Sequence, residues 1–334
     1  MSMKKRNGAM RRRAWAAAAL LATLAGASLA QEVWPAKPIK LIVPFPPGGG
    51  TDAMARLLAD KLATQAGWTL VIDNRPGAGG NLGLDAVAKA VADGYTIGLG
   101  QTANLAINPA LYPKMPFDPL QDFAPITSIA SQPVVLLVNA VSVLKTLADV
   151  VHASRAKPES LRIGLAGNGT VGHLAGEMLK RRADFEMLNV PYKGAGPAMT
   201  DLLGNQVELN FANTAPAIAQ LAGKRVRALA VSSAQRVHSV PELAAVPSVA
   251  EAGYPGFEAI TWTGLVAPAG TPQAVVERIN AEMQKVLKTP DVQHKLLSEG
   301  STPMGGTPRQ FADFIRAEHR KWGTLIRQAG IRLD

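Results

Sequence analysis

The sequence contains no cysteine, which excludes disulfide bonds, thiolate nucleophiles and cysteine metal sites. Aromatic residues make up only 5% of the chain, and the five histidines show no His-x-x-x-His spacing of the kind that binds zinc. The chain also lacks the Gly-x-Ser-x-Gly elbow of many hydrolases and the Gly-Lys-Ser/Thr ending of a phosphate-binding P-loop. These absences argue against hydrolase, zinc-enzyme and nucleoside-triphosphatase functions.

Long apolar runs are missing everywhere except near the amino terminus. There, a basic segment at residues 4–13 precedes the apolar run Ala14–Leu24, and Ser28-Leu29-Ala30 has the small-x-small pattern that signal peptidase cleaves. We therefore expect residues 1–30 to be a signal peptide, cleaved after Ala30, and the protein to be exported to the periplasm. No later stretch approaches the eighteen unbroken apolar residues of a membrane span.

The net charge of +10 arises mostly from this leader. It holds six of the 35 basic residues and none of the 25 acidic ones, so the remainder of the chain has a net charge of +4. No basic run interleaved with aromatic residues occurs after the leader, and we expect no nucleic-acid partner.

A strand followed by a glycine-rich turn and a helix opens the mature chain. Ile39–Val43 is a short apolar run, and the turn after it leads into a helix with Thr51 as its predicted N-cap and Asp52 in its first turn. Gly67 is the predicted end of this helix. Such a turn points several backbone N–H groups and the positive end of the helix dipole at one spot, which suits a small anion.

This order of strand, glycine turn and helix recurs along the chain. A second glycine turn at residues 74–81 follows the strand 68–72 and precedes the helix 82–91. The second half repeats the order, with strands at 161–166 and 187–190, turns at 167–173 and 192–197, and helices at 174–182 and 198–203. Alternating strands and helices predict an α/β fold with mostly parallel sheets flanked by helices.

The chain is predicted to form two lobes with a ligand cleft between them. The extended run 126–139 crosses into a second lobe, and the strand 259–266 returns to the first. We expect lobe 1 to comprise residues 31–130 plus 253–334 and lobe 2 to comprise residues 131–252. Hinges are expected near 128–133 and 253–261.

Two Thr-Pro pairs mark the last helices. Thr271-Pro272 and Thr307-Pro308 each combine a predicted N-cap with proline at the first helical position. They predict helices that end near residues 288 and 328. The apolar spacing of the second helix is typical of a packing role.

The main alternative to an anion-binding function is an enzyme that uses a dinucleotide cofactor. The residues from Gly167 to Gly172 form a formal Gly-x-Gly-x-x-Gly between a strand and a helix. However, the next strand ends in Asn189-Val190-Pro191-Tyr192, without the acid that binds the ribose hydroxyl. The glycine turns favour a carboxylate held by backbone N–H groups and hydroxyls, which needs no cofactor and no covalent chemistry.

Several motifs together resemble one family, the substrate-binding receptors of tripartite tricarboxylate transporters, also called the Bug family. In chain order these motifs are Lys37-Pro38-Ile39, Pro44-Phe45-Pro46-Pro47-Gly48-Gly49 with Asp52 and Ala55-Arg56, Asn74-Arg75-Pro76-Gly77-Ala78-Gly79-Gly80, Asp93-Gly94-Tyr95-Thr96, Gly167-Asn168-Gly169-Thr170 with His173-Leu174-Ala175-Gly176-Glu177, and Pro268-Ala269-Gly270-Thr271-Pro272. The resemblance covers essentially the whole mature chain. It implies a two-lobed periplasmic binding protein fold of type II-like architecture.

The resemblance also implies a set of ligand-binding residues at the matching positions. They are Phe45, Pro46, Gly48, Gly49, Thr51, Asp52, Gly79, Thr102, Gly169, Thr170, His173 and Asn213. Thr51, Asp52 and His173 also have purely structural interpretations, as an N-cap, a first-turn acid and a helix cap. The family often has Phe-Asp-Asn where this chain has Phe211-Ala212-Asn213, so an acidic contact is missing here.

The implied function is a receptor that captures a small organic carboxylate for uptake or sensing. Dicarboxylates, tricarboxylates, acidic amino acids and aromatic carboxylates all remain open. The expected partners are transporter membrane subunits or a sensor domain, and the protein is expected to be a monomer without metal or cofactor. The alternative is a secreted, cofactor-independent isomerase or lyase on the same fold that uses His173 and Asp52.

Overall fold

The computed structural model describes residues 34–331, so the predicted signal peptide and its cleavage site lie outside the described residues. Residues 34–36 contain no helix or strand. The fold described below is that of the compact unit that begins at Lys37.

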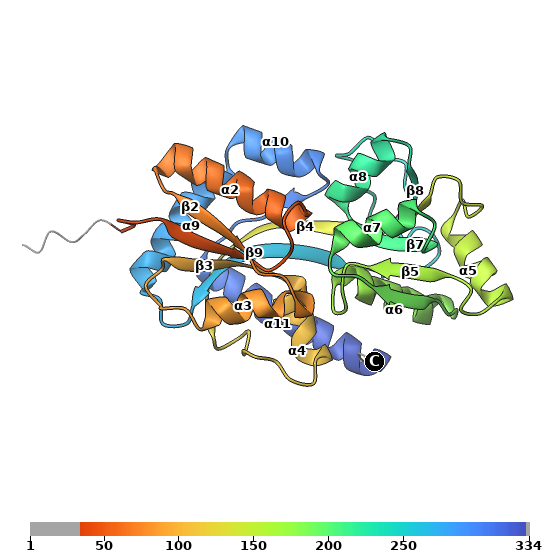
Figure 1. Ribbon diagram of the computed structural model, residues 1–334, viewed down its shortest axis with the longest axis horizontal. Helices are drawn as coiled ribbons and strands as arrows, with labels where there is room; N and C mark the ends of the chain where they lie inside the picture. Colours follow the sequence, from red (N-terminus) through yellow and green to blue (C-terminus); the bar gives the residue numbers. More distant parts are fainter. Residues whose placement is uncertain (1–33, 332–334) are drawn as a thin grey trace, which may run out of the picture. The chain divides into compact units, whose positions relative to one another are not determined.

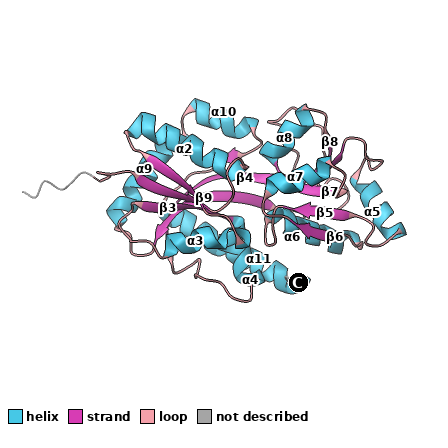
Figure 2. Ribbon diagram, in the orientation of Figure 1, coloured by secondary structure: helices cyan, strands magenta, loops and turns pink. Residues whose placement is uncertain are grey.

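Strands and helices alternate along this unit (Figures 1 and 2). The strands are β1 (Ile39–Val43), β2 (Leu70–Asn74), β3 (Thr96–Gln101), β4 (Phe123–Asn139), β5 (Arg162–Leu165), β6 (Leu188–Pro191), β7 (Leu209–Asn213), β8 (Val226–Val231), β9 (Ile260–Pro268) and β10 (Thr302–Pro303). The helices are α2 (Gly50–Ala66), α3 (Asn81–Ala88), α4 (Asn108–Leu111), α5 (Leu147–Ala156), α6 (Val171–Ala183), α7 (Ala195–Leu203), α8 (Thr214–Ala222), α9 (Gln273–Leu287), α10 (Pro290–Ser298) and α11 (Pro308–Ala329), with a 3-10 turn η1 (Ala78–Gly80) and a π-helical turn η2 (Ala103–Ile107).

The strands join in the order β2-β1-β3-β9-β4-β7-β5-β6, with β8 and β10 also paired to β4. β1, β2 and β3 pair in parallel, as do β5, β6 and β7. β1, β2, β5 and β6 are the strands of the four predicted strand-turn-helix units. β4, β8, β9 and β10 add antiparallel pairs between these two groups. The predicted α/β class with helices on the sheet faces is confirmed (Figure 2).

The long strand β4 belongs to both lobes. From Phe123 to Pro133 it pairs with β9, and from Val134 to Asn139 it pairs with β7 and β8. On the predicted division of the chain, the first lobe carries β1–β3, β9, β10, α2–α4 and α9–α11, and the second lobe carries β5–β8 and α5–α8 (Figure 1). The change of pairing at Pro133 adjoins the predicted hinge segment 128–133, whose motion remains a prediction.

The two faces of β7 support different parts of the core. Leu209 and Phe211 pack into the large apolar cluster that includes residues of α6, whereas Ala212 packs with Met199 and Leu202 of α7. This alternation follows from the twofold period of a strand. Asn210 shares the α7 face of β7 with Ala212.

Two of the three predicted threonine N-caps are wrong, for tertiary reasons. α2 has Gly49 as its N-cap, and the Thr51 hydroxyl instead accepts a hydrogen bond from Gln101. α9 has Pro272 as its N-cap, because the Thr271 hydroxyl donates to the Pro268 carbonyl. Thr307 does cap α11, and its hydroxyl accepts the N–H of Gln310 as the sequence predicts.

The structure contains helical segments that the sequence did not predict. α8 begins at Thr214, directly after β7 ends, so no turn residues separate the strand from the helix. α10 begins at Pro290 after Thr289, which is the same Thr-Pro pattern as in the predicted C-terminal helices. The π-helical turn η2 occupies a stretch interpreted as the end of a strand and a loop.

Candidate functional site

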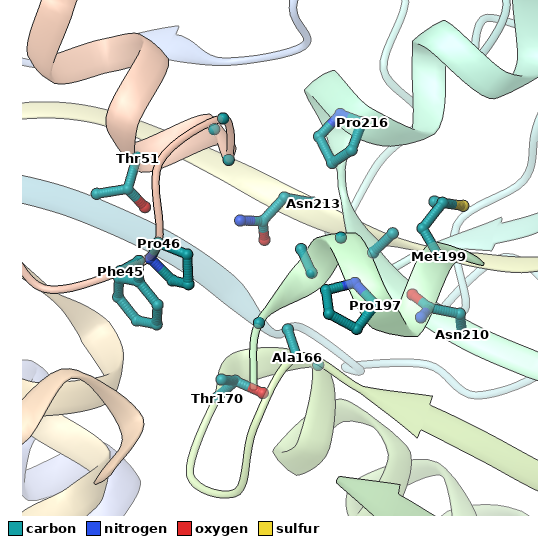
Figure 3. Close-up of a pocket in the computed structure, with 18 of the residues that line it drawn as sticks. Phe45, Pro46, Thr51, Ala166, Thr170, Pro197, Met199, Asn210, Asn213 and Pro216 are labelled. Carbon is teal, nitrogen blue, oxygen red and sulfur yellow. The ribbon is translucent and has the colours of Figure 1, made fainter. Parts of the chain in front are cut away.

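A cavity of about 810 Å³ lies between the loop after β1 and the helices of the second lobe (Figure 3). The first lobe contributes the loop from Phe45 to Gly49, the start of α2, and residues of β3, η2 and β9. The second lobe contributes the starts of α6, α7 and α8 and the strand β7. The predicted position of the ligand, beside glycine turns at strand ends, therefore coincides with a real cavity.

Three of the helices that begin at this cavity have no side-chain cap. Gly49, Gly194 and Asn213 are the N-caps of α2, α7 and α8, and none of them makes a side-chain hydrogen bond to its helix. The first N–H groups of a helix have no partner within the helix, and they carry the positive end of its dipole. Except at Pro197 in α7 and Pro216 in α8, which have no N–H, these groups are available to an anion in the cavity.

The charged residues around the cavity have one sign. Lys193 and Arg225 line it, and no aspartate or glutamate does so among residues 34–331. The remaining polar lining residues are hydroxyl and amide side chains such as Thr51, Thr170 and Asn213. Together with the helix N-termini, this electrostatic environment favours an anionic ligand.

Asp52 fixes the loop after β1 and does not line the cavity. Its carboxylate accepts hydrogen bonds from the Gly48 N–H at 3.0 Å, from the Arg56 guanidinium at 2.9 and 3.1 Å, and from the Asn74 amide at 3.0 Å. The Asn74 amide also donates to the Phe45 carbonyl. The Arg56 guanidinium is the main cause that lowers the pKa of Asp52, against the effect of burial, and the Gly48 N–H and Asn74 amide add to it.

We expect Asp52→Asn to lower the free energy of unfolding by about 1–2 kcal/mol at pH 7, because charge-assisted hydrogen bonds are lost. The folded pKa lies below 3.8, so the ionised carboxylate stabilises the protein above that pH and ceases to do so as the pH falls through the lowered pKa. The difference between wild type and variant should therefore be smaller at pH 2 than at pH 7. Urea denaturation of the wild type and the variant at pH 7 and at pH 2 measures this difference in the free energy of unfolding.

Asp60→Asn is the matched control on the same helix. The Asp60 side chain is exposed, and its only ion pair, with Lys61, spans 4.0 Å in the described structure. This variant should unfold like the wild type at both pH values. A difference for Asp52→Asn that is the same at pH 7 and pH 2 would contradict the assigned role of the carboxylate.

The hydroxyl of Thr51 is oriented by Gln101. The Gln101 amide donates to the Thr51 oxygen at 2.7 Å and also reaches the Thr263 hydroxyl at 3.4 Å. Because its oxygen accepts this hydrogen bond, Thr51 retains its own proton to donate to a group in the cavity that it lines (Figure 3). A carboxylate oxygen is a suitable acceptor.

The facing loop of the second lobe is held by two local hydrogen bonds. The Thr170 hydroxyl donates to the Gly167 carbonyl at 2.8 Å and accepts the His173 N–H at 3.4 Å, so Thr170 caps α6. The His173 ring nitrogen Nδ1 accepts the Gly169 N–H at 3.2 Å. Thr170 lines the cavity, whereas His173 is buried behind the loop.

Thr102 and Gly79 lie outside the cavity. The Thr102 hydroxyl accepts the Trp262 N–H at 2.7 Å and joins β3 to β9. The Gly79 carbonyl accepts from the Asn108 side chain at 3.3 Å, and its φ of +63° suits glycine. Both residues support the walls near the site.

The loop Gly167–Thr170 contacts the first lobe directly. A Cβ atom at Gly169 would lie 2.1 Å from Asn108 Oδ1, and the Tyr112 hydroxyl donates to the Asn168 carbonyl at 3.5 Å. Asn108 Oδ1 is buried and accepts no hydrogen bond from any described residue, although the amide nitrogen donates to Asn81 at 2.7 Å. The loop of the second lobe therefore contacts Asn108 and Tyr112 of the first lobe beside the cavity, and this contact leaves no room for a side chain at residue 169.

Of the twelve predicted site residues, the structure brings seven together around the cavity: Phe45, Pro46, Gly48, Gly49, Thr51, Thr170 and Asn213. The other five, Asp52, Gly79, Thr102, Gly169 and His173, are placed behind it or at the contact between the lobes. Sequence reasoning missed the lining residues of α7 and α8. The turn at residues 192–197 was a usable indication for α7, but Asn210, Gln220 and Arg225 carry no local pattern.

Two other kinds of site were sought in residues 34–331. No group of three or more histidine, cysteine or acidic side chains there is placed to hold a metal ion. No helix in the same range combines the length and apolar character that a membrane crossing needs.

Comparison with known proteins gives a consistent result. The model of a family described as tripartite tricarboxylate transporter family receptor matches residues 54–331. Protein BugT of Bordetella pertussis is 37% identical over 308 residues, which cover 92% of this chain and 94% of that protein.

Solved structures also resemble the chain over most of its length. Rpa4515 of R. palustris with adipate has a TM-score of 0.86 and 37% sequence identity, and the match covers 90% of this chain and 100% of that chain. MatC from Rhodopseudomonas palustris with bound malate has a TM-score of 0.82 and 31% identity, covering 88% of this chain and 100% of that chain.

Proposed function

Because this chain belongs to the tripartite tricarboxylate transporter family receptors, we propose that it is a periplasmic receptor that binds a small organic carboxylate in the cavity between its lobes. The relatives with adipate and malate support a dicarboxylate or a similar acid. The membrane partner would be the transporter of such a system, or a sensor protein, and the receptor would act as a monomer.

The observation that carries this function is the convergence of three uncapped helix N-termini on a cavity without acidic lining residues. Each helix N-terminus stabilises an anion by roughly 0.3–1 kcal/mol, and by about 2 kcal/mol when partly buried. Charge-assisted hydrogen bonds from hydroxyl and N–H donors add to this. Their sum is compatible with the ~8 kcal/mol of a micromolar complex.

The cavity favours some carboxylates over others. An acidic amino acid needs an acceptor for its ammonium group, but Asp52 already accepts four hydrogen bonds within the protein and does not line the cavity. Ala212 lines the position where the family often has an acid. We therefore favour ligands without an amino group.

We assign direct ligand contacts to the backbone of Gly49 and to the side chains of Thr51 and Asn213. Gly48 and Thr170 also line the cavity, but the Gly48 N–H donates to Asp52 and the Thr170 hydroxyl donates to the Gly167 carbonyl. Asp52 and His173 are assigned to the support of the two facing loops. The enzyme alternative requires these same two side chains to reach a substrate, and their internal hydrogen bonds support the receptor function instead.

A thermal-shift screen tests this function. The protein is unfolded and refolded to remove any captured ligand and is then mixed with organic acids, acidic amino acids, aromatic carboxylates and NAD. Ligand at a hundred times its dissociation constant should add about 2.7 kcal/mol of stability.

Thr51→Val should then reduce affinity for the selected carboxylate by about 10–100-fold, because a hydrogen bond to a charged group is lost.

Thr64→Val is the matched control, because the Thr64 hydroxyl is exposed and bonds only within α2 in the described structure. It should bind like the wild type. A shift with NAD alone, or turnover of the selected carboxylate, would contradict the receptor function.

A further inference from the structure

A groove extends the cavity into the second lobe along α7 and α8. On α7 the lining residues Gly196, Met199 and Leu203 recur every three to four positions, which is the spacing of one helix face. On α8 the lining residues Pro216 and Gln220 have the same spacing. Gly204, beyond the last residue of α7, also lines the groove. Nine helical residues span roughly 13 Å, so the groove follows α7 from end to end.

The walls of this groove are largely apolar. Met199 and Leu203 of α7, Pro216 of α8 and Ala212 of β7 line it. Figure 3 shows Thr51 and Pro46 on one side of the cavity and Met199 on the opposite side, toward the interior of the second lobe. A ligand that enters this part of the cavity gains contact with hydrocarbon rather than with charge.

Asn210 is the buried polar residue of the groove, whereas its other polar lining residues on α7 and α8, Thr200 and Gln220, are not buried. Its exposed fraction is 3%, it lies on the face of β7 that carries Ala212, and it lines the cavity beside Met199 (Figure 3). Within residues 34–331, its side-chain amide makes no hydrogen bond. Because neither amide atom is among the buried polar atoms that lack a partner, the amide is accessible from the cavity, where a polar group of a ligand can take the place of water.

The depth of Asn210 sets a length for that ligand. Asn210 precedes Asn213, the N-cap of α8, by three residues of strand, so the Cα atoms of the two residues lie roughly 10 Å apart. With bond lengths near 1.5 Å, an extended four-carbon dicarboxylate is only about 6 Å long, whereas an eight-carbon one is about 11 Å long. We therefore expect a short acid held at the N-termini of α2 and α8 to end before it reaches Asn210.

We propose, building on the receptor function above, that the groove selects an elongated carboxylate. One carboxylate lies at the N-termini of α2 and α8, an apolar body of about six carbons, either an alkyl chain or a ring, lies along α7, and a remote polar group meets the Asn210 amide. Arg225, exposed at the far end of the groove, provides a positive charge for a remote carboxylate.

Isothermal titration calorimetry of the refolded protein with succinate, adipate, suberate and sebacate tests this selection. Affinity should rise about fourfold for each buried methylene up to the eight-carbon acid and then level off. Asn210→Leu should reduce suberate affinity at least tenfold and succinate affinity much less, because the long acid is the one expected to contact residue 210.

A matched pair of tryptophan variants on α8 provides a second test. Gln220 lines the groove and Ala219 is exposed next to it, outside the lining. Gln220→Trp should abolish the gain with chain length, and Ala219→Trp should preserve it. Equal affinity for all four acids, or equal behaviour of the two variants, would overturn the assigned groove. If no carboxylate of any length binds, the receptor function itself fails, which is a distinct outcome.

Discussion

Replacing Glu318 by leucine should lower the free energy of unfolding by about 2–6 kcal/mol. The Glu318 oxygen Oε2 accepts the indole N–H groups of Trp262 and Trp322, each at 3.0 Å. Both indoles are almost completely buried, with exposed fractions of 1% and 0%. Leucine leaves two buried donors without an acceptor, and each such donor costs about 1–3 kcal/mol.

Urea denaturation followed by tryptophan fluorescence measures this loss. Glu318→Gln retains a carbonyl oxygen and should lose less stability than Glu318→Leu. Lys321→Met removes only the partly exposed ammonium group, 3.3 Å from Glu318, and should change stability by about 1 kcal/mol or less. If the leucine variant is as stable as the wild type, the two indole hydrogen bonds do not carry the assigned energy.

Gly169→Ala should reduce carboxylate affinity by about 10–100-fold. The added Cβ would lie 2.1 Å from Asn108 Oδ1 across the contact between the lobes. The Asn108 amide cannot easily turn away, because its nitrogen donates to the Asn81 side chain at 2.7 Å and to the Gly79 carbonyl at 3.3 Å. The lobes of the variant should therefore approach each other less closely around a ligand.

Gly67→Ala separates this clash from backbone strain. Gly67 ends α2 with a φ of +69°, close to the +76° of Gly169, but nothing lies within 4 Å of its Cβ position. Both variants should lose about 1 kcal/mol of stability, and only Gly169→Ala should lose affinity. Calorimetry with the selected carboxylate, and small-angle scattering for lobe separation, distinguish them. Unchanged affinity of Gly169→Ala would show that this contact does not accompany binding.

Local features of the fold were predicted best from the sequence. β1 has the predicted bounds Ile39–Val43, and Gly67 ends α2 with a positive φ, because both depend on neighbouring residues alone. The N-cap of α2 could not be predicted, since the partner of Thr51 is Gln101, fifty positions away. α8 was missed because it follows β7 without a turn.

The candidate site also has a part that local sequence patterns predicted and a part that depends on tertiary packing. Glycine turns at strand ends predicted the mouth of the cavity, because that arrangement follows from α/β topology. The groove between α7 and α8 required the packing of two helices on β7, and no local pattern at Asn210 or Gln220 reveals it. The supporting roles of Asp52 and His173 likewise depend on their hydrogen bonds with Asn74 and Gly169, which no sequence pattern predicts.

The position of β9 between β3 and β4 has a consequence for how the chain matures. Gln101 of β3 meets Thr263 of β9 across a sequence separation of 162 residues, whereas β3 and β4 are near neighbours in the chain. A chain made from its amino end therefore completes the whole second lobe before the central strand of the first lobe exists. Until residue 268 emerges, the edge of β3 has no partner strand, and it must be kept from pairing with another chain.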